Sequence, residues 1–394
     1  MPLSQSELTM WSSDPDERPA WADDRAINER YVRGEGRIVI ESNREKLPGF
    51  VNQLKDPNYM DLRPFYQRRP RWDVRTQSLL IESFIMNIPV PPVFLYERDF
   101  NSYEVMDGQQ RITAIRDFYA NSFKLRGLET WPELNGRTYL TLPEKLRAGI
   151  DRRSITSIVL LKESTESEEE ASLLRETVFD RLNTGGIKLE RQEIRNALYR
   201  GAFNEMLNDI TRMDDFREVW GMPRWVEGEI ETNPTLVADP FFAKMMDSEV
   251  VLRFFALRHV DHYRRGMQGF LDLYMRRAAK FNDSDVAELR EIYVRTLSFA
   301  KEIYSEHLFR PYSAERTSWE AKPHRAFQDA VMIGLSERLA DETMLKQRSS
   351  QILEATKQLF LSHPDGTFTG RGNTKQDIKD RINLYRKMLE EVLK

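Results

Sequence analysis

Residues 36–205 combine helical and strand-like patterns of hydrophobic positions. Within residues 77–86, apolar side chains recur at the spacing of one helix face. The short apolar runs 93–96 and 103–106 are joined by a polar connection, which predicts a β-hairpin. Further strands are expected at 37–41 and 154–161, and further helices at 46–54, 112–121, 163–178 and 189–199. This mixture predicts an α+β domain.

Beyond residue 205 the pattern is almost wholly helical. Helices are expected near 248–258, 265–280, 285–307, 324–339, 343–361 and 376–393, with prolines in several of the connections. No internal repeat is evident, which argues against a solenoid. The sequence therefore predicts an all-helical domain over 206–394. Residues 1–35 read as an irregular N-terminal arm with a short helix at 24–31 and little chemistry of its own.

Composition and charge exclude several function classes. The 394 residues carry 59 Lys and Arg against 63 Asp and Glu, a formal net charge of -4, so the chain as a whole is not a polycation. The absence of cysteine excludes a disulfide framework, a thiolate nucleophile, an Fe–S cluster and a cysteine zinc site. No run approaches the roughly 18 to 20 apolar residues that span a bilayer, and the polar N-terminus lacks a signal peptide. We therefore expect a soluble cytoplasmic protein that makes no membrane contact.

The segment Asp107-Gly108-Gln109-Gln110-Arg111 lies at the corner between the predicted hairpin and the helix at 112–121. Glycine directly after a strand allows a tight turn, and a helix start directs free N–H groups toward an anion. Arg111 offers a permanent cation for phosphate oxygens, and the two glutamines offer amides for a sugar, a base or a water. Asp107 can accept Mg²⁺ or orient a water. The alternative is structural: Asp107 caps the helix, and the other side chains are solvated.

A second group of polar residues follows the paired glycines of residues 183–186. Gln192, Arg195, Asn196 and Tyr199 share one face of the expected helix, while the apolar residues between them face inward. The glycine turn either brings backbone close to a ligand or simply ends the preceding helix. A ligand-binding face and an ordinary helix end both remain open.

An arginine-rich segment forms a third candidate. Residues 63–75 hold five arginines in thirteen residues, with aromatic neighbours. Such a segment can contact DNA phosphates or stack a base on Trp72, but solvated ion pairs explain it equally well. The DNA-binding candidates are Arg69, Arg71, Trp72 and Arg75.

Other signals are weak. The pair His259 and His262 has a spacing compatible with a metal but no evident third ligand. The sequence contains no Walker P-loop, no HExxH motif and no GxSxG motif, which disfavours Walker-type NTPases, zincins and α/β-hydrolases.

Read in order, these motifs resemble the N-terminal domain family of GmrSD-type restriction endonucleases. The resemblance is carried by residues 65–68 with Trp72, by 88–95, by Asp107–Arg111, by 179–186 and by 192–196. It implies a ParB/sulfiredoxin-like α+β fold and nucleotide binding or hydrolysis at the DGQQR corner, in a prokaryotic system that restricts phage or foreign DNA. Carried over to this sequence, the motif site is Asp107, Gly108, Gln109, Gln110 and Arg111, with Arg68, Arg181 and Asn183 as neighbours.

The resemblance does not extend to a nuclease. Fused family members carry a C-terminal HNH domain with a His-centred metal cluster, whereas His307, His324 and His363 are widely spaced in this sequence. One hypothesis is therefore a Mg²⁺-dependent nucleoside-triphosphate hydrolase of a defence system. Its catalytic residues are Asp107, Gln110 and Arg111, and Asp107 holds the nucleotide-bound Mg²⁺. Its nucleotide-binding residues are Arg68, Gly108, Gln109, Arg181, Asn183, Gln192, Arg195 and Asn196.

Two other hypotheses remain. One is a ParB-like module that binds or nicks DNA through the arginine-rich segment. The other is a non-enzymatic subunit whose helical domain docks a separate nuclease or another defence subunit. A homo-oligomer is compatible with each of them.

Overall fold

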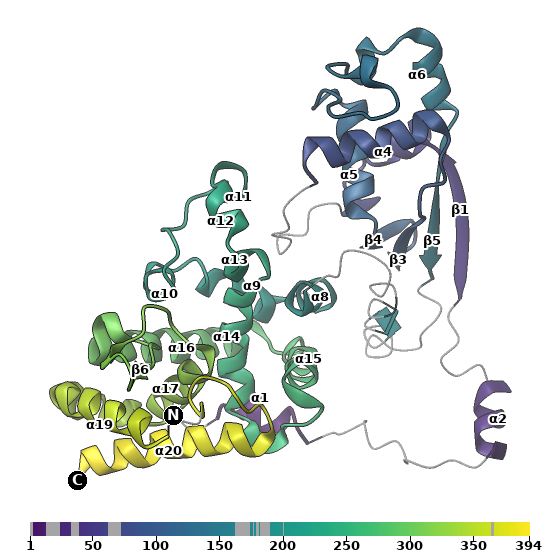
Figure 1. Cartoon of the computed structure of the whole chain (residues 1–394). Coiled ribbons are helices and arrows are strands. Elements are labelled where there is room, and N and C mark those ends of the chain that lie inside the picture. Colours follow the sequence, from purple (N-terminus) through teal and green to yellow (C-terminus); the bar gives the residue numbers. More distant parts are fainter. Residues whose placement is uncertain are drawn as a thin grey trace. The chain divides into compact units, whose positions relative to one another are not determined.

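The chain forms two compact units in a computed structural model that describes residues 3–12, 24–32, 39–61, 72–161, 174–175, 177–178, 181, 190–199, 201–363 and 366–394. Pro19–Leu189 form one unit, here called the α+β unit. Met1–Arg18 and Glu190–Lys394 form the other, here called the helical unit. The predicted class, an α+β region followed by a helical region, is confirmed (Figure 1).

The α+β unit is built on a five-stranded sheet with the order β1-β5-β3-β4-β2. β1 is antiparallel to β5, and β4 is antiparallel to β3, while the β3–β5 and β2–β4 pairs are parallel. The predicted hairpin is confirmed as β3 and β4, which lie between β5 and β2. The strands are β1 (Ile40–Lys46), β2 (Met60–Asp61), β3 (Val93–Asp99), β4 (Ser102–Asp107) and β5 (Ser154–Leu160).

Four helices pack on one face of this sheet. They are α3 (Leu47–Gln53), α4 (Val74–Met86), α5 (Gln109–Tyr119) and α6 (Glu144–Asp151). Alternate strand residues, Val93 and Leu95 in β3 and Ile155 and Val159 in β5, enter the same core as the apolar sides of these helices. Each such buried side chain contributes about 1.5–3 kcal/mol. The core therefore fixes the position of α5 against the hairpin.

Residues of opposite parity are buried on the other face of the sheet. Tyr96 and Glu104 are both buried, and the Arg175 guanidinium lies 4.8 Å from the centroid of the Tyr96 ring. Arg175 Nη1 is 3.7 Å from Glu104 Oε2. A buried charge on a sheet needs such a partner, so this pair satisfies a carboxylate in the middle of an apolar strand.

The helical unit is organised around α17 (Arg325–Glu337), which packs against α14 (Met246–Leu257), α16 (Asp283–Tyr304) and α20 (Lys375–Leu393). Nearly all of α17 is buried. A Cβ at Gly334 would lie 2.5 Å from Tyr385 Cδ1, so glycine allows α17 and α20 to approach closely. The other helices are α1 (Gln5–Thr9), α8 (Arg191–Leu198), α9 (Ala202–Ile210), α10 (Asp214–Val219), α11 (Glu229–Thr232), α12 (Pro234–Ala238), α13 (Pro240–Ala243), α15 (Gly266–Ala278), α18 (Glu342–Gln347) and α19 (Ser349–Ser362).

The structure differs from the expected pattern in three places. The expected helix 343–361 is two helices, α18 and α19, which meet at Arg348. A short strand pair, β6 (Tyr312–Ser313) and β7 (Ser318–Trp319), interrupts the helical unit. The boundary between the compact units lies at Glu190, not at the expected residue 205, because α8 packs against α14 and α15.

The N-terminal arm is only partly as expected. The expected short helix is present as α2 (Asp24–Val32). A second helix, α1, belongs to the helical unit and begins with a capping box of Ser4 and Glu7. Glu7 is 0% exposed; its carboxylate accepts a hydrogen bond from Arg258 Nη2 at 3.0 Å and lies 3.3 Å from His259 Nε2. The expectation of an irregular arm with little chemistry was wrong here, because a buried carboxylate anchors it.

Contacts with the N-terminal arm also occupy His259 and His262, whose spacing is compatible with a metal site. Trp11 Nε1 donates to His259 Nδ1 at 3.0 Å, and the Trp11 ring stacks on His262 at 4.5 Å. Among the described residues, no group of three or more His, Asp or Glu side chains could hold a metal ion. No helix within the described ranges is long and apolar enough to cross a bilayer.

Candidate functional site

The DGQQR segment forms a tight corner in the α+β unit. Asp107 ends β4, Gly108 turns the chain with a φ of 98°, and Gln109 begins α5. A Cβ at Gly108 would lie 2.5 Å from Val93 Cγ1 and 3.0 Å from Arg111 Nη2. Both the positive φ and this close approach exclude a side chain, so glycine is required for the corner to close.

Arg111 turns back to pair with Asp107. Arg111 Nη2 donates to Asp107 Oδ2 at 2.6 Å and to the carbonyl oxygen of Pro92 at 3.2 Å. The arginine side chain is 16% exposed, whereas the aspartate side chain is 46% exposed. The carboxylate is therefore held from one side by a mostly buried guanidinium and is open to solvent on the other.

Asp107 does not cap α5, which was the structural alternative to a ligand-binding role. The N-cap of α5 is Gly108, and within the described residues no side chain caps this helix start. The carboxylate bonds to Arg111 and not to a backbone N–H of the first turn. The positive end of this eleven-residue helix, whose dipole favours an anion, thus lies beside the Asp107–Arg111 pair.

The two glutamines lie on the first turn of α5 and are half-buried. Gln110 Oε1 accepts from the backbone N–H of Trp72 at 3.1 Å. Trp72 directly precedes Asp73, which caps α4 by accepting from Thr76 N at 2.8 Å. This bond ties the corner to the start of α4, which gives Gln110 a positioning role.

The structure describes only part of the arginine-rich segment and of the predicted neighbours of the corner. Arg68, Arg69, Arg71 and Asn183 lie outside the described residues. Arg75 is exposed and 3.2 Å from Glu129 Oε1 in an ion pair. Trp72 packs against the hydrophobic core that includes the apolar side of α4, so part of its side chain is covered by this packing. Arg181 is exposed and belongs to the α+β unit.

The predicted polar face of α8 lies in the helical unit and faces inward. Gln192, Arg195, Asn196 and Tyr199 are all buried, so the expectation that only the apolar residues of this helix face inward was wrong. Arg195 is 1% exposed, and its Nε donates to Asp272 Oδ1 at 2.7 Å. Buried charge must be paired, and this helix pairs it inside its own unit.

The network around Arg195 is extensive. Its Nη1 donates to Gln192 Oε1 at 2.9 Å and to Glu249 Oε2 at 3.2 Å. Arg191 Nη2 adds a second guanidinium on Asp272 at 2.8 Å. The roles of Gln192, Arg195 and Asn196 as nucleotide ligands stay predictions, and their observed contacts are all structural.

Sequence reasoning missed two supports of the corner. The Pro92 carbonyl holds Arg111, and the Val93 side chain packs where a side chain at residue 108 would lie. It also missed the Arg175–Glu104 pair, which lies on the face of the sheet opposite the four helices. The only available signal was a glutamate inside the apolar run 103–106, which indicates a buried charge that needs a partner.

Comparison with known proteins bears on the segment that carries this corner. Residues 49–200 match the family model described as GmrSD restriction endonuclease, N-terminal domain. No curated protein and no solved structure matches the chain. The matched segment begins within α3 and ends just after α8, so it contains the whole DGQQR corner.

Proposed function

We propose that the chain binds a nucleoside triphosphate at the DGQQR corner and hydrolyses it. The match of residues 49–200 to the family model of the GmrSD restriction endonuclease N-terminal domain, which suggests a component of a restriction-type defence system, supports this proposal. One observation carries this proposal. Among the described residues, no side chain caps the start of α5 at Gly108, and the open carboxylate of Asp107 beside it is held by the mostly buried guanidinium of Arg111.

Phosphate binding follows from the helix start. The first N–H groups of α5 lack intrahelical acceptors, and the helix dipole favours negative charge at this end. Gly108 lets the backbone approach a ligand without a side chain in between. We propose that these N–H groups hold the phosphate, with Gln109 and further cations from Arg68 and Arg181 around it.

Asp107 is the residue that fits a nucleotide-bound Mg²⁺. One of its oxygens, Oδ2, accepts from Arg111, which leaves Oδ1 without a partner among the described residues. Magnesium is commonly held by one or two carboxylates together with substrate phosphates, and it neutralises charge that develops on them. Arg111 fixes the orientation of the carboxylate through a charge-assisted hydrogen bond, and Gln110 ties the first turn of α5 to the backbone of Trp72.

The test compares two aspartates of similar setting. Asp107→Asn removes the proposed metal-binding charge. Asp117→Asn removes the other aspartate of α5 that pairs with an arginine, since Arg116 Nη2 lies 2.7 Å from Asp117 Oδ1. Phosphate release from nucleoside triphosphates with Mg²⁺ should fall at least about 100-fold in Asp107→Asn and stay within about twofold of wild type in Asp117→Asn. Thermal unfolding checks that both variants fold.

Two results would overturn the proposal. One is the absence of any nucleotide binding by calorimetry in the wild-type protein. The other is equal hydrolysis by wild type and Asp107→Asn. Nicking of a plasmid with Mg²⁺ or Mn²⁺, combined with no phosphate release, would instead favour a ParB-like DNA module.

A further inference from the structure

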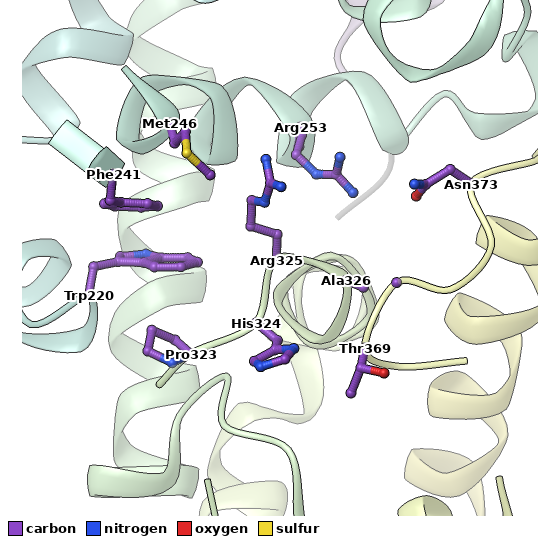
Figure 2. A pocket seen from close by; sticks show the side chains of 11 residues that line it. Trp220, Phe241, Met246, Arg253, Pro323, His324, Arg325, Ala326, Thr369 and Asn373 are labelled. Atoms are coloured by element: carbon purple, nitrogen blue, oxygen red, sulfur yellow. The ribbon is translucent and has the colours of Figure 1, made fainter. Parts of the chain in front are cut away.

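The helical unit contains a cavity of about 300 Å³ between α14, the start of α17 and the loop before α20. Figure 2 shows Arg325 rising from the first turn of α17 toward α14, with Trp220 and Phe241 to one side and Arg253 to the other. The cavity lies wholly in the helical unit and outside the segment matched to the GmrSD family. None of the residues that line it belongs to the DGQQR corner.

Two arginines supply the cationic end of the cavity. Arg253 is buried, and its Nε donates to Asp329 Oδ1 at 3.0 Å, with Nη2 on the other carboxylate oxygen. Its Nη1 has no partner among the described residues. Arg325 is 42% exposed and uses Nη1 on Glu249 Oε1 at 3.3 Å. Both guanidinium groups thus keep N–H donors for a ligand in the cavity that they line.

The carboxylates around these arginines do not cancel their charge. Asp329 also attracts a second buried arginine, Arg381. Burial lowers the pKa of Arg381, the attraction of Asp329 raises it, and the nearby charge of Arg253 lowers it. Arg381 Nη1 is buried without a hydrogen-bond partner in the described chain. Glu249, which pairs with Arg325, is also shared, because Arg195 bonds to its other oxygen. Each carboxylate therefore faces two guanidinium groups.

A helix start adds to this positive end. α17 is thirteen residues long, and within the described residues no side chain caps its N-terminus. Arg325 and Ala326, its first two residues, line the cavity. The free N–H groups of that turn join the two guanidinium groups as donors for an anion. His324, just before the helix, is paired with Glu320, its Nε2 lying 3.0 Å from Oε2.

An apolar flank lies opposite the cationic end. The rings of Trp220 and Phe241 stack with centroids 4.7 Å apart and an interplanar angle of 17°. Both rings and Met246 line the cavity. A ligand that fills the space would therefore place its charged group at the arginines and a planar or apolar group against these rings.

We propose that this cavity binds a phosphate monoester that carries a planar group, of the size of a nucleoside monophosphate. The volume lies at the lower limit of small-molecule sites, which suits one such ligand. The phosphate is held by Arg253, Arg325 and the start of α17, and the planar group lies against Trp220 and Phe241. The helical unit is thus a second ligand-binding part of the protein.

Calorimetric titration of the full chain with adenosine 5′-monophosphate tests the proposal. Arg325→Ala removes one proposed phosphate donor from a partly exposed position. Arg338→Ala is the matched control, because it lies at the other end of α17 and also pairs with a carboxylate, Glu390 Oε1 at 2.9 Å. Arg325→Ala should weaken binding about tenfold or more, while Arg338→Ala should leave it unchanged. Asp107→Asn should also leave this binding unchanged, which separates it from the corner.

Inorganic phosphate and adenosine are the partial probes. Each should bind more weakly than the whole monophosphate, and Trp220→Leu should weaken the monophosphate but not inorganic phosphate. Thermal unfolding confirms that each variant folds. The proposal fails if the monophosphate does not bind, if Arg325→Ala binds it like wild type, or if inorganic phosphate binds equally tightly, since the planar group would then contribute nothing.

Discussion

Replacing Gly108 with alanine tests the geometry on which the candidate site rests. The residue has a φ of 98°, which side chains rarely adopt, and its added Cβ would approach Val93 Cγ1 to 2.5 Å. Val93 is 0% exposed and lies in the central strand of the sheet, so it has little room to move. Either the start of α5 or the hairpin must therefore shift.

The expected loss has two parts. A non-glycine residue in this backbone region costs about 1–3 kcal/mol, and forcing a methyl group into a packed core costs about 1–3 kcal/mol more. The sum, about 2–6 kcal/mol, is a large share of the roughly 5–15 kcal/mol by which domains are stable. Gly136→Ala isolates the first part, because Gly136 in the same unit has a φ of 85° and nothing within 4 Å of an added Cβ.

The assay is guanidinium unfolding of the full chain, followed by circular dichroism. Gly108→Ala should lose about 1–3 kcal/mol more than Gly136→Ala. A double-mutant cycle with Val93→Ala provides the sharper measurement, because removing the Val93 methyl groups should relieve the clash and give a favourable coupling. Equal losses in the two glycine variants, or no coupling with Val93→Ala, would refute the close approach of the corner to β3.

Two further predictions concern buried ionisable groups. Burial raises the pKa of Glu7, but its bond to His259 and the charge of Arg258 outweigh this and hold the pKa below 4.5. Glu7→Gln should therefore lose about 3–5 kcal/mol of stability at pH 7, and the difference from wild type in denaturant midpoint should shrink as the pH falls below 4.5. Burial and a hydrogen bond to Asp151 raise the pKa of Tyr139 to about 12. The neutral phenol therefore stabilises the fold below pH 10, and Tyr139→Phe should reduce the loss of stability between pH 10 and 12; an unchanged loss would contradict this.

Local pattern was enough to predict most elements of the fold. The hairpin of β3 and β4 follows from two alternating runs, and α4, α14 and α20 follow from apolar positions with helical spacing. The break between α18 and α19 at Arg348 was missed, because no proline or glycine marks it in the sequence. The sheet order was not predicted either, since pairing depends on contacts between distant strands.

The position of the candidate site could be predicted, but its internal pairing could not. A glycine between a strand and a helix indicates a tight corner from sequence alone. Whether Arg111 faces solvent or turns back to Asp107 depends on the Pro92 carbonyl, which comes from the neighbouring strand segment. The docking of the arm through Glu7 was hidden for the same reason, because its partners lie about 250 positions further along the chain.

The polar face of α8 shows that a motif inside the matched segment can be held by contacts within the helical unit. The matched segment extends to residue 200, yet α8 packs against α14 and α15 in the helical unit. Arg195 satisfies Asp272 and Glu249, and leaving either carboxylate buried without a partner would cost about 3–5 kcal/mol. The need for this pairing explains an amide and a guanidinium on one helix face without any ligand. The polar groups at the DGQQR corner differ, because Asp107 stays open to solvent although it pairs with Arg111, and Arg111 Nε is buried without a hydrogen-bond partner among the described residues.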